Sequence, residues 1–291
     1  MSNLEQRTTG DAQRSAAEWF EYGHRAEGEG DFATARRSYA AAVAREPSRA
    51  EWHYRLGCAC RKLDLLDDAA VAFRRAVELD PAQGRYLTNL GVALDRQGNR
   101  VDAARVLQRA ILQDPRNAEA QHNLGAIFAE EGRTEEAVRA FEAAIAVRPD
   151  ADGYHNLGLV HFTHDAFDRA LASFDAALGL SPDFALASYY AGLCLMKKGV
   201  YREAVRRFER ALELDPRLVR AHFYIGTCLH KVGQHEPALA SLRRALEAFP
   251  EDPRLHYQLG LTYDALLLPQ EAREHYRRSR GASPSGFGGT I

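Results

Sequence analysis

The stretch GRYLTNLGVALDRQGNRVDAARVLQRAILQDPRN, residues 84–117, decides the fold of this chain. It carries Gly91, then Ala103 twelve residues later, then Pro115 after twelve more. The same triplet recurs about every 34 residues through almost all of the 291 residues, and eight of the 11 prolines fall on this lattice. A fixed period of this size predicts a solenoid of identical supersecondary units, because each unit buries its apolar face against its neighbours.

Each member of the triplet occurs eight times. The glycines are Gly23, Gly57, Gly91, Gly125, Gly158, Gly192, Gly226 and Gly260. The alanines are Ala35, Ala69, Ala103, Ala137, Ala170, Ala204, Ala238 and Ala272. The prolines are Pro47, Pro81, Pro115, Pro149, Pro182, Pro216, Pro250 and Pro284. Counted from Ala16, glycine is eighth, alanine twentieth and proline thirty-second in each unit. No boundary interrupts the series, so we expect one continuous array although length alone suggests about two domains.

Two amphipathic helices are predicted in each unit, because apolar residues recur at spacings of three, four and seven. Small residues at positions 8, 20 and 27 let the two helices approach closely, and a bulky residue at position 24 fills the space opposite. A glycine between the helices predicts a left-handed turn, and the proline ends the second helix because it has no N–H group to donate. The bulky residues are Tyr39, Phe73, Leu107, Phe141, Phe174, Phe208, Leu242 and Tyr276. The turn glycines are Gly30, Gly98, Gly132, Gly199 and Gly233.

This combination of glycine, alanines and proline resembles the pattern of tetratricopeptide repeats. The resemblance implies an all-α, right-handed superhelical solenoid of eight helix-turn-helix repeats, whose first helices line a concave groove. The units are 16–49, 50–83, 84–117, 118–150, 151–184, 185–218, 219–252 and 253–286. The fourth unit has 33 residues, one fewer than the others, and the missing residue falls in the linker around Asp150. A local kink is expected there.

The two ends of the chain differ from the repeats. Residues 1–15 and 287–291 lack the periodicity, and we interpret them as a polar N-terminal tail and a C-terminal tail. The eighth unit has Arg280 at position 28, where the first seven units have an aliphatic residue. A last helix with nothing stacked on it needs a solvated outer face, so this unit is interpreted as the terminal cap.

Composition bounds the compartment and the class of partner. The net charge of −2 argues against a dedicated nucleic-acid-binding protein, which needs a basic surface. The N-terminus lacks a basic region followed by an apolar stretch, and no apolar run approaches 18 residues. The sequence therefore predicts a cytoplasmic location, without membrane insertion and without nucleic acid as a partner.

Cysteines and histidines are interpreted as structural. Cys194 and Cys228 take a position filled elsewhere by small apolar residues, and Cys58 and Cys60 point apart on one helix. His161 and His164 are one helical turn apart and could share a metal, but His161 occupies a slot that is apolar in other units. No phosphate loop, nucleophile elbow or dinucleotide fingerprint is present. We therefore expect no catalytic residue, no metal and no cofactor.

Three asparagines mark the expected groove. Asn89, Asn123 and Asn156 share position 6 of consecutive first helices. Helix layers lie about 8–10 Å apart and an extended peptide advances about 3.3–3.6 Å per residue, so one amide per layer meets the peptide backbone about every third residue. A similar ladder grips peptides in the tetratricopeptide domain of O-linked N-acetylglucosamine transferase. The alternative is a generic helix residue, since asparagine is also common at this position in the family.

Aromatic and basic residues gather in the last third of the expected groove. An aromatic ring beside a cation suits a ligand with an apolar anchor and a carboxylate. The alternative is packing, because tyrosine is frequent at position 5 in the family. The candidate residues are Tyr189, Tyr190, Phe223, Tyr224, Tyr257 and Gln258, with Lys197, Arg220, Lys231 and Arg254 around them.

The sequence thus predicts a non-catalytic scaffold that binds an extended peptide segment of a partner protein in its groove. Two other classes stay open. One is a scaffold for self-association into homo-oligomers, and the other is a subunit that delivers substrate to a separate enzyme such as a glycosyltransferase. The clamp that binds chaperone tails in this family is disfavoured, because no unit pairs Lys at position 5 with Asn at position 9.

Overall fold

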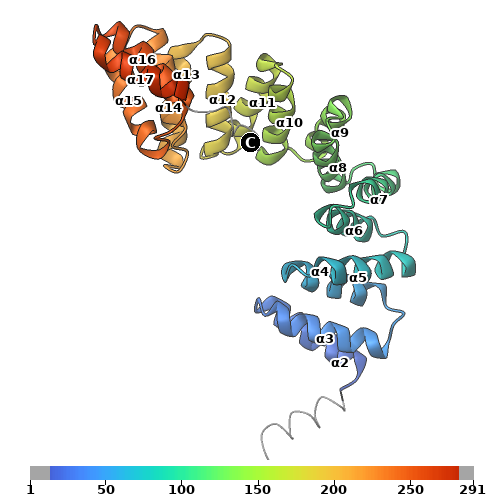
Figure 1. Ribbon diagram of the computed structural model, residues 1–291. Helices are drawn as coiled ribbons and strands as arrows, with labels where there is room; N and C mark the ends of the chain where they lie inside the picture. The colour runs from blue at the N-terminus through green and yellow to red at the C-terminus, as the bar shows by residue number, and fades with distance from the viewer. Residues whose placement is uncertain (1–13, 282–291) are drawn as a thin grey trace, which may run out of the picture. The chain divides into compact units, whose positions relative to one another are not determined.

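The computed structural model describes residues 14–281, which form sixteen helices and no strand (Figure 1). In the first four repeats the helices are α2 (Ala16–Gly28), α3 (Phe32–Arg45), α4 (Ala50–Lys62), α5 (Leu66–Leu79), α6 (Gly84–Arg96), α7 (Arg100–Gln113), α8 (Ala118–Glu130) and α9 (Thr134–Val147). In the last four they are α10 (Ala151–Thr163), α11 (Phe167–Leu180), α12 (Ala185–Lys197), α13 (Tyr201–Leu214), α14 (Ala221–Lys231), α15 (His235–Ala248), α16 (Pro253–Ala265) and α17 (Pro269–Gly281). The prediction of an all-α chain with two helices in each repeat is confirmed.

The chain divides into two compact units, one ending at Arg148 and one beginning at Pro149. Each helix within a unit packs against the helix before it and the helix after it. The division falls in the linker of the repeat that is one residue short, where Asp150 directly caps α10 by accepting from the N–H group of Gly153 at 2.6 Å. The prediction of one continuous array of eight repeats stays a prediction.

Close approach of the two helices in each repeat depends on the glycine at position 8. A Cβ atom added to any of these glycines would lie 2.5–3.0 Å from the position-24 side chain of the same repeat, nearer than real Cβ contacts come. Gly57, for example, faces the ring of Phe73, which is fully buried. The alanines at position 20 are buried as well. The predicted packing of small residues against bulky ones is confirmed.

The turn between the helices of each repeat has one residue in the left-handed region. The five predicted glycines occupy it with φ between 72° and 82°. The other three repeats place Asp64, Asp165 and Leu267 there, with φ of 59°, 57° and 58°. A side chain is strained in this region, since its Cβ approaches the following carbonyl oxygen. Leu267 is the costliest of the three, because Asp tolerates this conformation better than Leu.

The first repeat begins within the described residues, and the last repeat extends beyond them. Ser15 caps α2 through a reciprocal pair of bonds with Glu18, so the predicted first repeat position, Ala16, begins the helix. Most of the predicted N-terminal tail lies outside the described residues. The same holds for the predicted C-terminal tail and for residues 282–286 of the eighth repeat.

Candidate functional site

First helices of neighbouring repeats contact one another in both units. In the second unit α10 contacts α12, α12 contacts α14 and α14 contacts α16, and in the first unit α6 contacts α8. Among residues 14–281, second helices make no comparable contacts with one another. In these pairs of repeats the first helices approach each other more closely than the second helices do.

Asn89 of α6 and Asn123 of α8 make the same side-chain hydrogen bond to their own helix. The side-chain nitrogen of Asn89 donates to the carbonyl of Arg85 at 2.9 Å, and that of Asn123 donates to the carbonyl of Glu119 at 2.8 Å. The helix carbonyl takes one N–H group of the amide, and the side-chain oxygen can accept a hydrogen bond from a ligand. Asn123 is half-exposed, whereas Asn89 is buried. Asn156 belongs to the second unit and is half-buried in α10.

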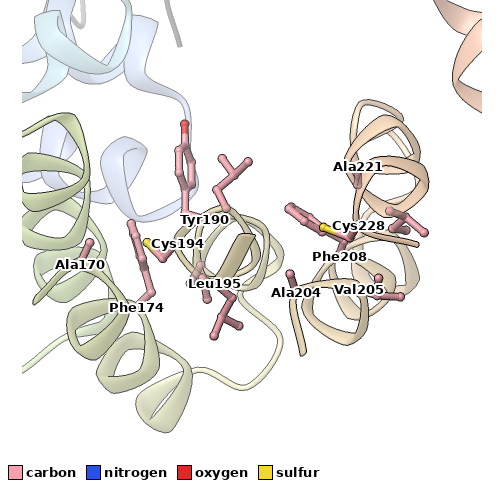
Figure 2. Packing of buried hydrophobic residues seen from close by; sticks show 14 of the residues in the cluster. Ala170, Phe174, Tyr190, Cys194, Leu195, Ala204, Val205, Phe208, Ala221 and Cys228 are labelled. Atoms are coloured by element: carbon pink, nitrogen blue, oxygen red, sulfur yellow. The ribbon is translucent and has the colours of Figure 1, made fainter. Parts of the chain in front are cut away.

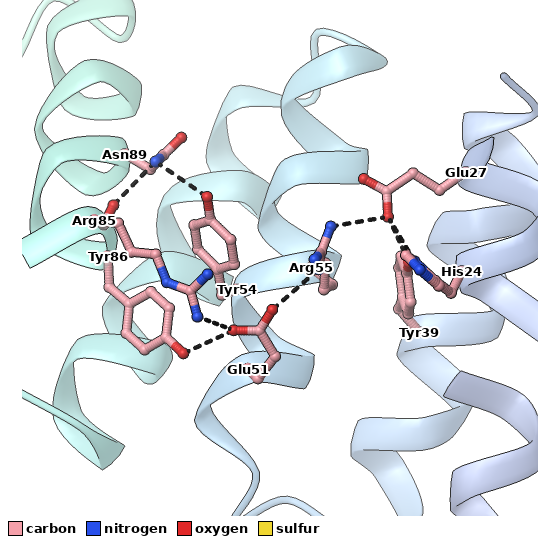
Figure 3. A network of polar contacts seen from close by, with 9 residues as sticks. All are labelled: His24, Glu27, Tyr39, Glu51, Tyr54, Arg55, Arg85, Tyr86 and Asn89. Atoms are coloured by element: carbon pink, nitrogen blue, oxygen red, sulfur yellow. Dashed lines mark hydrogen bonds and ion pairs between the residues drawn. The ribbon is translucent and has the colours of Figure 1, made fainter. Parts of the chain in front are cut away.

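A polar network that the sequence analysis missed joins the first three repeats (Figure 3). Glu51 accepts from Arg55 Nε at 3.0 Å, from an Arg85 guanidinium nitrogen at 2.5 Å and from the Tyr86 hydroxyl at 3.0 Å. Arg55 also pairs with Glu27 at 3.5 Å. A signal was present, because Glu51 and Arg85 carry opposite charges one repeat apart at the same position. These charges stabilise the stacking of repeats, since they satisfy one another.

Part of the predicted aromatic patch belongs to the core of the second unit (Figure 2). Tyr190 is only 8% exposed, and its ring stacks on Phe174 at 5.6 Å. Tyr224 stacks on Phe208 at 5.4 Å, and the half-buried Tyr189 meets the edge of the same ring at 5.7 Å. Burial raises the pKa of Tyr189 and of Tyr190. The position-6 rings therefore fill space beside the position-24 rings, and the prediction that Tyr190 faces the groove does not match its burial.

Four predicted residues converge at the end of the second unit. Phe223 of α14 and Arg254, Tyr257 and Gln258 of α16 line one concavity of about 660 Å³. Tyr257 is 53% exposed, which is unusual for so large an aromatic side chain, and Gln258 is buried. The remaining lining residues were not predicted as site residues. They are Pro253, Tyr276, Ser279 and Arg280.

The predicted cations have different surroundings. Arg220 donates to Asp252 at 3.2 Å, and its guanidinium lies over the Phe249 ring at 4.5 Å. Arg220 therefore holds the beginning of α16 to the beginning of α14. Lys197 and Lys231 are exposed in the last turns of α12 and α14, where a positive charge complements the helix dipole. The sequence analysis gave Arg280 only the role of a solvated cap, and the structure places it in the lining of the concavity.

Three of the four cysteines lie in the interior of residues 14–281. Cys60, Cys194 and Cys228 are buried and free. Burial raises the pKa of Cys60 to about 11 and of Cys194 and Cys228 to about 12, which keeps the thiols protonated. The ring nitrogen Nδ1 of His164 contacts the Val160 carbonyl at 3.0 Å. No group of three potential metal ligands occurs in the described part of the chain.

No helix within the described residues has the length and apolarity needed to cross a bilayer.

Comparisons with known proteins agree with this architecture. Sequence profiles described as tetratricopeptide repeat match residues 20–84, 88–154, 127–183, 155–201 and 195–261. A comparison with curated proteins gives no match.

Several solved structures resemble the chain. YrrB, described as a TPR protein with an unusual peptide-binding site, is 24% identical with a TM-score of 0.59, over 69% of this chain and 100% of its own. MamA is 28% identical with a TM-score of 0.53, over 58% and 92%. The C-terminal part of a TPR protein from Cytophaga hutchinsonii is 18% identical with a TM-score of 0.68, over 82% and 99%. The profile matches cover well over half of the sequence, and this chain belongs to the tetratricopeptide-repeat family.

Proposed function

We propose that this chain is a non-catalytic scaffold that binds an extended segment of a partner protein along the first helices of its repeats. Membership of the tetratricopeptide-repeat family supports a role in protein interaction. The observation that carries the finer proposal is the concavity between α14, α16 and α17. There, four side chains selected from the sequence as ligand-binding residues line one space of about 660 Å³.

The spacing of the first helices suits an extended peptide. Helices in contact lie about 8–10 Å apart, and an extended chain covers that distance in about three residues. One repeat then meets every third residue of the peptide. Asn123 offers a side-chain oxygen to a peptide N–H group, and Tyr257 offers an exposed ring to an apolar side chain.

A cytoplasmic location, protein rather than nucleic acid as the partner, and the absence of catalysis belong to the same proposal. Self-association is the alternative reading of the groove, with a segment of a second copy as the occupant. Light scattering over a wide range of protein concentrations separates the two, because only self-association raises the mass of the pure chain.

The test is a selection of random peptides on the intact chain, followed by affinity measurements with variants. Asn123→Ala should weaken the peptides that it affects by about 0.5–1.5 kcal/mol whatever their side chains, since it removes one net hydrogen bond. Tyr257→Ala should cost about 2 kcal/mol and change which peptides are retained. Leu112 and Leu180 are exposed on second helices, and Leu112→Ala and Leu180→Ala serve as matched controls. Losses confined to the control variants would place the interface on the second helices and reject the proposal.

A further inference from the structure

Two histidine rings meet between α16 and α17, the two helices of the last repeat. His256 of α16 is only 2% exposed, and its Nδ1 atom lies 2.8 Å from the Nδ1 atom of His275 in α17. Two nitrogens come this close only when one donates a proton to the other, because two bare nitrogens or two N–H groups repel each other. The contact therefore holds one proton between the two Nδ1 atoms.

The second nitrogen of His256 fixes which ring donates. Its Nε2 atom lies 2.8 Å from the carbonyl oxygen of Pro250, and a carbonyl oxygen can only accept. The proton of neutral His256 therefore resides on Nε2, which leaves Nδ1 as a bare acceptor. His275 then supplies the N–H group of the contact from its own Nδ1 atom. The contact between the two helices thus exists only while Nδ1 of His256 carries no proton.

The charged groups around His275 offer little to a further positive charge. Arg243 of α15 donates to the Tyr263 hydroxyl at 3.0 Å, and the Tyr263 ring stacks on His275 with centroids 5.3 Å apart. Arg278 lies on the same helix as His275 and donates to Glu274 at 2.9 Å, so that carboxylate already has a cation as its partner. Two guanidinium groups and a paired carboxylate therefore surround the ring.

Other titratable and charged groups near α16 have partners of their own. Asp252, the N-cap of α16, accepts from Arg220 at 3.2 Å. Nδ1 of His230 in α14 contacts the Thr262 hydroxyl at 3.3 Å, and that hydroxyl donates to the Gln258 carbonyl at 2.8 Å. Protonating His230 would not break its contact, because Nδ1 can donate to the hydroxyl oxygen in the neutral and in the charged ring.

Acid favours separation of the two rings. Burial, and then the neighbouring His256, lower the pKa of His275, with Arg278 and Arg243 acting in the same direction and Glu274 against them. A histidine released to solvent has its ordinary pKa of about 6.5 and takes up a proton that the closed contact disfavours. The contact is therefore stable above about pH 6.5, and this stability is progressively lost as the pH falls below that value.

The same two helices build the concavity between α14, α16 and α17. Tyr257 and Gln258 directly follow His256, and Tyr276 directly follows His275. These three following residues line the concavity, and the rings of Tyr257 and Tyr276 are 5.9 Å apart. Among residues 14–281, the extensive helix contacts of α17 are with α16. Loss of the histidine contact therefore loosens the wall that α17 contributes to the concavity.

We propose that the contact between His256 and His275 is a pH-sensitive switch that holds α17 on α16 near neutral pH and releases it in acid, which opens the concavity. The inference goes beyond the proposed function, because it concerns the last repeat itself and holds whatever the concavity binds.

The first experiment locates the protons in the intact chain. Long-range proton–nitrogen NMR spectra of isotopically labelled protein at pH 7.5 separate the two neutral tautomers of each histidine. We expect the Nε2–H tautomer for His256 and the Nδ1–H tautomer for His275. The opposite assignment, or a charged His256 at this pH, would overturn the inference.

A second measurement follows the two helices as the pH falls. Hydrogen exchange corrected for intrinsic rates should show at least about tenfold more frequent opening of α17 at pH 5.5 than at pH 7.5, since one pH unit below the ordinary pKa changes proton binding about tenfold. Helix α13, in the same unit, serves as the internal reference. The nuclear Overhauser contact between the rings of Tyr257 and Tyr276 should be lost over the same pH range. Persistence of this contact, or of a closed α17, would contradict the switch.

His256→Gln tests the contact through a gain of acid resistance. Gln121 holds the equivalent position in the fourth repeat, and its side-chain nitrogen donates to the Pro115 carbonyl at 2.7 Å. The introduced amide can therefore keep the bond to Pro250 and offer its oxygen to His275 without titrating. In this variant α17 should stay closed at pH 5.5, a result that loss of folding cannot mimic.

His53→Gln is the matched control. His53 holds the same position in the second repeat and contacts the Pro47 carbonyl at 2.9 Å, but it lies in the first unit. This variant should leave the acid-induced opening of α17 unchanged. An acid response of α17 that persists in His256→Gln, or that disappears in His53→Gln, would assign the pH sensitivity to other groups and reject the inference.

Discussion

The hydroxyl of Tyr276 donates a hydrogen bond to the Asp264 side chain at 2.7 Å, joining α17 to the end of α16. The first repeat contains the equivalent bond, in which Tyr39 donates to Glu27 at 2.6 Å (Figure 3). Tyrosine at position 24 occurs only in these two repeats, and the six between them have Phe or Leu. The first and last repeats each have a tyrosine hydroxyl bond between their two helices, which Phe or Leu at position 24 of the other repeats cannot make.

Removing this tie should destabilise the first repeat more than the last. Tyr39 is fully buried, and burial followed by the Glu27 bond raises its pKa, whereas the Tyr276 bond is exposed. Tyr39→Phe should lower the free energy of unfolding by about 1.5–3 kcal/mol, the range for hydrogen bonds to a charged group. Tyr276→Phe should have a smaller effect. Urea unfolding followed by circular dichroism measures both, and equal losses would contradict the difference in burial.

Relief of backbone strain should stabilise the last turn. Leu267 has φ of 58° and is 86% exposed, so its side chain gains little from packing. Leu267→Gly should raise the free energy of unfolding by up to about 1 kcal/mol, because the relief of about 1–2 kcal/mol exceeds the entropy that glycine costs. Gly233→Leu at the matching turn should lower it by a similar amount. Differential scanning calorimetry compares the two, and a lower melting temperature for Leu267→Gly would contradict the strain.

A methyl group at position 8 should force the two helices of a repeat apart. A Cβ atom on Gly57 would lie 2.6 Å from the Phe73 ring, whereas one on Gly28 would meet nothing within 4 Å. Gly57→Ala should therefore cost about 1–3 kcal/mol of stability through overpacking. Gly28→Ala should be neutral or stabilising, since alanine is the better helix former. Thermal unfolding distinguishes them, and tolerance of Gly57→Ala would show that the ring can move aside.

Acidification should weaken the second unit. Burial lowers the pKa of four histidines there, namely His155, His222, His230 and His275. Each is favoured in its neutral form when folded, so the unfolded chain binds more protons below about pH 6.5. The stability they contribute is present above that pH and is lost as the pH falls below it. Hydrogen exchange corrected for intrinsic rates should show faster opening of α14–α17 at pH 5.5 than at pH 7.5.

The contact between His256 and His275 is the sharpest part of this prediction. Their Nδ1 atoms are 2.8 Å apart, and Nε2 of His256 contacts the Pro250 carbonyl at 2.8 Å. When both rings are neutral, the N–H group at one Nδ1 can donate to the other Nδ1, whereas two charged rings would place two donors against each other. Burial and then the neighbouring His256 lower the pKa of His275, with Arg278, Glu274 and Arg243 also nearby. His275→Gln should flatten the pH dependence, and an unchanged profile would assign it to other histidines.

Periodicity predicted the fold because every repeat has the same pattern of small and bulky residues. Composition alone does not link Gly57 to Phe73. Their spacing of sixteen residues recurs in all eight repeats, and it places the glycine of the first helix against the bulky side chain of the second. Repeat positions also predicted four residues of the concavity. Phe223, Tyr257 and Gln258 occupy positions of first helices that were expected to face inward, and Arg254 lies beside them.

Contacts between side chains of adjacent repeats were harder to predict than the positions of residues within one repeat. Tyr190 occupies a position predicted to face inward, yet its ring stacks on Phe174 and is buried. The sequence predicted Arg220 as a cation beside the groove. Its partner Asp252 is 32 residues away, and the repeat pattern does not imply that contact. These contacts depend on the particular side chains of two adjacent repeats. A pattern that all repeats share therefore does not predict them.

The glycine contact has a consequence for how such a chain can change its length. Each position-8 glycine meets the bulky side chain of its own repeat, not that of a neighbour. A duplication or deletion of one whole period therefore carries its own pair with it and leaves every other pair intact. A cut inside a repeat separates glycine from ring and leaves both without a complement. Recombination in whole cassettes is thus the route by which an array of this type can lengthen or shorten while each helix pair still closes.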